Sequence, residues 1–161
     1  METWDVYDKR RNKTNKLHVR GDSLADGEYH IVVHVWIKND KGEILLAKRH
    51  EDKHFPNLWE CPGGSVLAGE TSLQGALREV KEEIGITLSR SNGRLLKSER
   101  RDHFQDFCDV WLFHQSFDLR ATNLQKDEVI DIKWVTEAEM DSMFEFHCMV
   151  PVLDYYKSMQ W

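Results

Sequence analysis

Residues 63–86 read GGSVLAGETSLQGALREVKEEIGI, and this stretch decides the fold because one strong helix signal follows a glycine-rich loop. The recurrence of its apolar residues predicts an α-helix over 71–84. Thr71 and Gln74 have the form of a capping box at its start, and Gly85 is placed to end it. The apolar side of this helix comprises Leu73, Ala76, Leu77, Val80 and Ile84.

The other side of the predicted helix carries three carboxylates within less than two turns. Glu79 lies three residues before Glu82 and four before Glu83, so the three share one side. Each close like-charge pair costs an isolated helix roughly 0.2–0.5 kcal/mol. A solvated acidic surface is the ordinary explanation of such a run. A preceding glycine-rich loop, where backbone can approach a ligand closely, favours instead a divalent cation among these oxygen ligands.

The composition predicts one globular domain spanning 1–161. Of the 161 residues, 40% are hydrophobic and 31% charged, which suits a chain with its own core. The net charge of -6 argues against a nucleic-acid polymer as partner. Three widely spaced cysteines suit free thiols in a reducing cytoplasm, and we expect neither a signal peptide nor a membrane-spanning segment. We therefore expect a cytoplasmic protein.

Alternating and β-branched stretches predict most of the remaining structure. Residues 1–28 are expected to form an N-terminal β-hairpin extension. The further strands are expected at 29–39, 44–49 and 58–61, twice within 95–117, and at 129–135.

Two more helices are expected after the last strand. Thr136 and Glu139 form a capping box before 137–144, and Pro151 suits the first turn of a C-terminal helix over 150–159. The order of elements predicts an α+β fold, an α/β/α sandwich with a mixed β-sheet packed between helices.

The glycine-rich stretch and its helix resemble the Nudix box over 23 residues. Every defined position of that pattern is filled, namely by Gly64, Glu70, Arg78-Glu79, Val80, Glu82-Glu83, Gly85 and Ile86. So long a match is a specific signal. The resemblance implies a Nudix fold and the hydrolysis of diphosphate bonds in small molecules built as a nucleoside diphosphate linked to another group.

The resemblance also implies roles for the carboxylates. By position in the box, Glu82 and Glu83 are the main ligands of Mg²⁺ or Mn²⁺, and Glu79 is either a third ligand or the general base. Arg78 has the spacing to pair with Glu82 and hold its carboxylate in place. Glu70 has two readings of equal weight, support of the metal site or capping of the helix.

Further residues are candidates for binding the substrate. Gly63 and Gly64 let the loop approach closely, and a backbone carbonyl there is a candidate metal ligand. Arg49 and Lys53, four residues apart after a strand, are candidates to bind phosphates, with an ordinary charged hairpin end as the alternative. In similar enzymes a loop after the box supplies a further glutamate, and Glu128 is the candidate here, although a solvated strand-entry residue is the favoured reading.

Two other functions remain as alternatives. The region around Arg49 and His30 also resembles isopentenyl-diphosphate isomerases, which use a Cys-Gly-His segment before the box. Here Gly63, Gly64 and Ser65 occupy those positions, which favours the hydrolase. A non-catalytic nucleotide-binding module ranks lower, because all box carboxylates are kept. The sequence leaves the oligomeric state open, a homodimer included.

Overall fold

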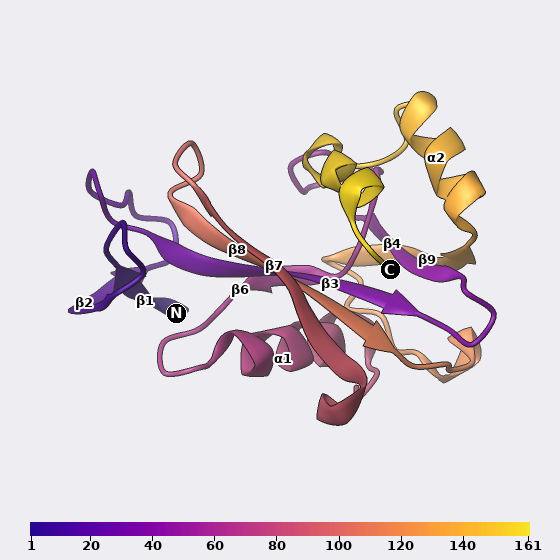
Figure 1. Cartoon of the computed structure of the whole chain (residues 1–161), viewed down its shortest axis with the longest axis horizontal. Coiled ribbons are helices and arrows are strands. Elements are labelled where there is room, and N and C mark those ends of the chain that lie inside the picture. The colour runs from indigo at the N-terminus through magenta and orange to yellow at the C-terminus, as the bar shows by residue number, and fades with distance from the viewer.

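The computed structural model describes residues 1–161 and centres on a mixed β-sheet (Figure 1). Its main path runs β5-β4-β3-β8-β7, while β6 pairs with β3 and β9 pairs with β4. The β3–β8 pair is parallel, and all the other pairs are antiparallel. The strands are β3 (His30–Lys38), β4 (Ile44–Arg49), β5 (Trp59–Glu60), β6 (Gly63–Ser65), β7 (Gly93–Arg101), β8 (Asp106–His114) and β9 (Val129–Val135).

Helices cover both faces of the sheet, so the predicted sandwich of a mixed sheet between helices is confirmed (Figure 1). Because side chains alternate along a strand, β3 supplies both cores. Val33 and Val35 belong to the cluster that includes Val80 of the helix on one face. Trp36 belongs to the cluster on the other face, beneath the C-terminal segments that carry Leu153.

The helix α1 (Ser72–Ile84) matches the prediction from its apolar spacing. Thr71 accepts a hydrogen bond from the backbone N–H of Gln74, and the Gln74 side chain accepts one from Thr71, so the capping box is present. Gly85 ends the helix with φ 77°, a left-handed conformation that glycine adopts without strain.

The C-terminal region differs in part from the prediction. The helix α2 (Glu137–Glu145) is capped by Thr136 and Glu139 as expected. The final segment η3 (Pro151–Ser158) is a 3₁₀-helix rather than an α-helix. Its buried residues Leu153 and Tyr156 are three apart, and a 3₁₀-helix places such residues directly above one another, facing the sheet. Two single-turn 3₁₀ segments, η1 (Arg90–Asn92) and η2 (Leu119–Ala121), lie in the connections.

The expected N-terminal hairpin is present as β1 (Thr3–Tyr7) and β2 (Lys13–Val19), which form a separate two-stranded sheet. Two contacts dock it on the domain. Arg11 in its turn forms a two-pronged pair with the buried carboxylate of Asp109 on β8, at 2.7 and 2.6 Å. Trp4 stacks on His30 with ring centroids 4.1 Å apart, so His30 is a buried strand histidine.

The glycine-rich loop also differs from the prediction, because residues 63–65 form the short strand β6 on β3. Val33 faces Gly64, and a side chain at Gly63 would collide with the carbonyl oxygen of Val33. A glycine is therefore required for this close strand pairing. No helix of the structure has the length and apolar character needed to cross a membrane.

Candidate active site

The three carboxylates of α1 gather where the helix meets β6. Glu83 is buried, with 6% of its surface exposed, and accepts one hydrogen bond, from the backbone N–H of Gly63 at 3.3 Å. Glu79 lies so close to Gly64 that a Cβ there would be 2.5 Å from its carboxyl carbon. Glu82 extends from the same side of the helix, and about half of its side chain is exposed.

Arg78 holds this arrangement together. Its Nη1 donates to Glu79 at 2.9 Å and to Glu82 at 3.1 Å, which is the pairing that the spacing predicted. Its Nε and Nη2 both donate to Glu70, and Nη2 also donates to the carbonyl of Ser65. One guanidinium thus fixes the helix carboxylates relative to β6.

Glu70 supports the arginine rather than the helix end. Both of its oxygens accept hydrogen bonds from Arg78, and it also accepts one from the backbone N–H of Leu67. Capping of α1 is carried out by Thr71 instead. Of the two readings of Glu70, the geometry supports the one that acts through Arg78.

Burial sets the electrostatics of the site. Burial raises the pKa of Glu83 well above its usual value, and the negative charges of Glu60 and Glu79 raise it further. Burial also raises the pKa of Glu79, although the Arg78 guanidinium opposes the shift. A second positive charge among these carboxylates would offset the cost of burying them.

The donor set fits a hard divalent cation, since it consists of carboxylate oxygens around a buried and weakly bonded Glu83. Side-chain positions alone do not define the site, because no three His, Cys, Asp or Glu residues of the chain form a group that could hold a metal ion. Glu79 and Glu82 both accept hydrogen bonds from Arg78.

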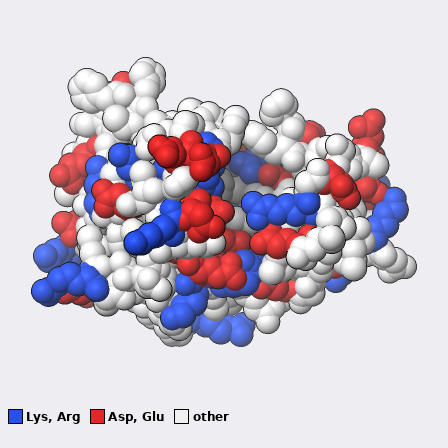
Figure 2. All heavy atoms as spheres, turned by 180° about the vertical axis from the view of Figure 1, so that it is seen from behind, with Lys and Arg blue, Asp and Glu red and all other residues white.

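These carboxylates line a cavity of about 140 Å³ without hydrophobic residues. Acidic side chains gather near the middle of the face in Figure 2, with basic side chains beside them. Lys53 and Glu128 both line the cavity and form an ion pair with each other. The lining is completed by Glu2, Arg20, Gly63, Gly64, Ser65, Glu79, Glu82, Glu83 and Gln125.

Sequence reasoning missed Arg20 and Glu2, which enter the cavity from the N-terminal hairpin. They form an ion pair at 2.8 Å, and the hydrogen bond to Glu2 raises the pKa of Arg20, as do the more distant charges of Glu128 and Glu79. No local pattern around Arg20 signals this role, because it depends on how the hairpin docks.

Arg49 and Lys53 are not brought together. Arg49 lines a neighbouring pocket on the other side of β6, where its Nη1 donates to both oxygens of Glu60 at 2.7 Å and its Nε to the carbonyl of His54. Only Lys53 of the pair faces the carboxylate cavity. Binding of phosphate by Arg49 stays a prediction.

The fold and this site match a known family. The family model of the NUDIX domain matches residues 28–153. The chain belongs to the NUDIX domain family. It is 44% identical over 146 residues to an uncharacterized Nudix hydrolase of Listeria innocua, covering 89% of this chain and 85% of that protein. The predicted Nudix membership is confirmed, and the chain is a Nudix hydrolase.

Two further comparisons extend this NUDIX assignment. A segment of 51 residues, 32% of this chain, is 45% identical to 40% of the 8-oxo-dGTP diphosphatase of Escherichia coli. The crystal structure of DR0079 from Deinococcus radiodurans shares the fold with a TM-score of 0.74, covering 92% of each chain at 21% identity. The N-terminal hairpin lies largely before the matched NUDIX residues.

The isomerase alternative finds no support in this NUDIX domain. Cys61, the cysteine nearest to the box, is buried with 3% of its surface exposed. Burial raises the pKa of its thiol well above the usual value, which disfavours proton transfer near neutral pH.

Proposed function

We propose that this Nudix hydrolase cleaves the diphosphate bond of a small molecule in which a nucleoside diphosphate is linked to another group, with Mg²⁺ or Mn²⁺ as cofactor. The observation that carries the proposal is the buried Glu83 beside Glu79 and Glu82, in a cavity lined only by polar groups and glycines. A buried carboxylate with one hydrogen bond at 3.3 Å is costly unless a cation offsets its charge.

Glu82 and Glu83 would hold the divalent ion, and Glu79 is either a third ligand or the general base. When bound, such an ion neutralises phosphate oxygens and lowers the pKa of a coordinated water. The chain's own residues position the catalytic carboxylates. Arg78 fixes Glu79 and Glu82, and the burial that raises the pKa of Glu79 moves it toward the range in which a general base works efficiently.

Lys53 and Arg20 are the cations that face the cavity, and we assign them to the substrate's phosphates. They come from different parts of the chain, since Lys53 follows β4 and Arg20 follows β2. Each is paired with a glutamate, Lys53 with Glu128 and Arg20 with Glu2, so each position is fixed before substrate arrives.

Arg20→Ala is expected to raise KM about tenfold with little change in kcat, because a charge-assisted hydrogen bond to phosphate is worth roughly 1.5–3 kcal/mol and the exposed position of Arg20 puts its contribution at the lower end. Steady-state kinetics on the best substrate measures this. Arg120→Ala is the matched control, since Arg120 is exposed and pairs only with Asp118. Equal KM values for Arg20→Ala and the control would remove Arg20 from the substrate site.

A screen of a diphosphate library, with release of phosphate or pyrophosphate as readout, tests the function itself. We expect at least one nucleoside-diphosphate-linked compound to be cleaved with Mg²⁺ or Mn²⁺ present, and cleavage to stop when EDTA is in excess. Binding without cleavage across the library would instead identify a nucleotide-binding module. Cleavage that persists after metal removal would contradict the assigned roles of Glu82 and Glu83.

A further inference from the structure

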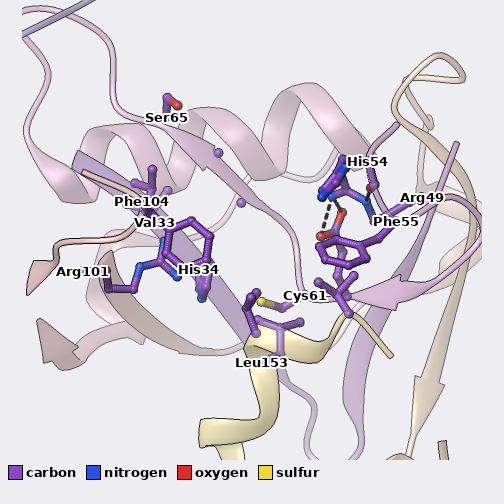
Figure 3. A pocket seen from close by; sticks show the side chains of 16 residues that line it. Val33, His34, Arg49, His54, Phe55, Cys61, Ser65, Arg101, Phe104 and Leu153 are labelled. Carbon is purple, nitrogen blue, oxygen red and sulfur yellow. Dashed lines mark hydrogen bonds and ion pairs between the residues drawn. The ribbon is translucent and has the colours of Figure 1, made fainter. Parts of the chain in front are cut away.

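A second cavity, of about 280 Å³, lies beside the carboxylate cavity. The two share Gly63, Gly64 and Ser65, so both border β6. In Figure 3, His34, Arg101 and Phe104 lie on one side of this second cavity, and Arg49, His54 and Phe55 lie on the other. A substrate with its phosphates against Gly64 therefore has room to extend into this cavity.

Both arginines of the second cavity form ion pairs with carboxylates. Arg49 is paired with Glu60, and Arg101 donates two hydrogen bonds to Asp106, both at 2.7 Å. Half of the lining residues are hydrophobic. Because the carboxylate cavity has no hydrophobic lining residue, the second cavity suits the uncharged part of a substrate better.

His34 is a polar residue of this lining, and its hydrogen bonds indicate which ring nitrogen carries the proton. Tyr155 Oη lies 3.1 Å from Nε1 of Trp36 and 2.7 Å from Nδ1 of His34. An indole N–H can only donate, so the tyrosine oxygen accepts from Trp36. Apart from Trp36, Tyr155 Oη has no hydrogen-bond partner in the protein other than Nδ1 of His34, so we infer that Tyr155 donates and Nδ1 accepts. As an acceptor, Nδ1 can also receive the thiol proton of Cys108, whose Sγ lies 3.5 Å away.

The remaining proton of His34 is therefore on Nε2. Burial lowers the pKa of His34 to about 3, so the ring is neutral near physiological pH and carries one proton. Nε2 has no hydrogen-bond partner within the protein, while His34 lines the cavity. The imidazole thus presents an N–H donor to the cavity, and the hydrogen bond between Tyr155 and Nδ1 fixes this tautomer.

We propose that this cavity binds a nucleobase, with an acceptor atom of the base receiving a hydrogen bond from Nε2–H of His34. Phe55 and Phe104 provide apolar aromatic surface on the two sides, which suits a flat ring. The Arg101 guanidinium lies 4.7 Å from the Phe104 ring and holds that side. Tyr155 is the positioning residue. This inference rests on the proposed function only in placing the phosphates in the neighbouring cavity.

The first test needs no substrate. Long-range ¹H–¹⁵N spectra of the wild-type protein are expected to show His34 protonated at Nε2 and not at Nδ1, unchanged between pH 5 and 8. Tyr155→Phe removes the proton donor and should populate the other tautomer. A wild-type spectrum with the proton on Nδ1, or a His34 signal that titrates between pH 5 and 8, would overturn the proposal.

The second test compares AMP, CMP, GMP and UMP with ribose 5-phosphate, which lacks a base, in calorimetric titrations with Mg²⁺ present. We expect at least one nucleotide to bind more tightly than ribose 5-phosphate and to shift the His34 Nε2 resonance. In His34→Phe this advantage should fall about tenfold, while His34→Gln, whose amide can donate from a similar position, should retain part of it. His114→Phe, at an exposed strand end, is the control.

The outcomes separate this inference from the proposed function. If none of the four nucleotides binds better than ribose 5-phosphate, or if His34→Phe keeps the full advantage, the nucleobase site is wrong even if diphosphates are cleaved. If the base advantage depends on His34 while no diphosphate in the library is cleaved, the site stands and the hydrolytic function fails.

Discussion

Glu83→Gln is expected to lower kcat/KM for the best diphosphate by roughly 10²–10³-fold, the loss typical when a preorganised electrostatic group is removed. In chelator, its melting temperature is expected to be no lower than that of the wild type. The physical reason is burial, because glutamine keeps the shape of the side chain and removes a charge that has only one hydrogen bond to the protein. Kinetics and thermal unfolding of the same preparation measure both effects.

Glu145→Gln is the control for this variant, because Glu145 lies exposed on α2. Its kinetics and melting temperature should match those of the wild type. Wild-type activity in Glu83→Gln would take Glu83 out of the metal site. Reduced activity together with a lower melting temperature would show that Glu83 has a structural role instead.

Asp109→Asn is expected to lower the free energy of unfolding by about 2–3 kcal/mol, because it leaves the Arg11 guanidinium without its buried partner. The pair anchors the N-terminal hairpin on β8, and Arg11 also donates to Ser98 of β7. Since the hairpin carries Arg20 to the carboxylate cavity, KM should rise as well. Urea unfolding and steady-state kinetics measure the two effects.

The stability difference should depend on pH. Burial raises the pKa of Asp109, but hydrogen bonds from Arg11 and Ser98 outweigh it, so the pKa in the folded protein lies below its usual value. A carboxylate of this kind stabilises the fold above its unfolded pKa of about 3.9 and loses that contribution as the pH falls through the folded value. The difference between wild type and Asp109→Asn is therefore largest near neutral pH and shrinks below about pH 4.

Asp22→Asn is the control, because Asp22 is exposed near the end of the same hairpin. It should change neither the unfolding free energy nor its pH dependence. An Asp109→Asn protein as stable as this control at neutral pH would contradict the anchoring role of the Arg11 pair.

Part of the site could be predicted because it depends on interactions between residues close together in the sequence. The helix, both of its ends and the pairing of Arg78 with Glu82 depend on residues three or four apart, and the structure has all of them. For Glu70 the local pattern allows two roles, support of the metal site or capping of the helix, because either one satisfies it. The contact from Arg78 to Glu70 supports the reading that acts through Arg78, and that contact depends on the path of the loop before the helix.

The predictions were weaker where strands meet. The sequence predicts a loop for the glycine-rich segment, but its pairing with β3 makes it a strand, and no pattern within residues 63–65 specifies that partner. Arg49 and Lys53 are close in sequence, and their spacing predicts that they bind phosphates together. The bend after β4 puts them in separate cavities, because Arg49 turns to Glu60 and Lys53 to Glu128.

By itself the sequence determined the family, the α+β fold class and the carboxylate face of α1, since each is encoded in residues close together along the chain. Only the tertiary structure brought Arg20 to the carboxylate cavity and placed His34, hydrogen-bonded to Tyr155, on the lining of the second cavity. Both depend on contacts between distant segments, of the docked hairpin and of Tyr155 with β3. Such contacts follow from burial and hydrogen bonding of the whole fold, which local spacing does not record.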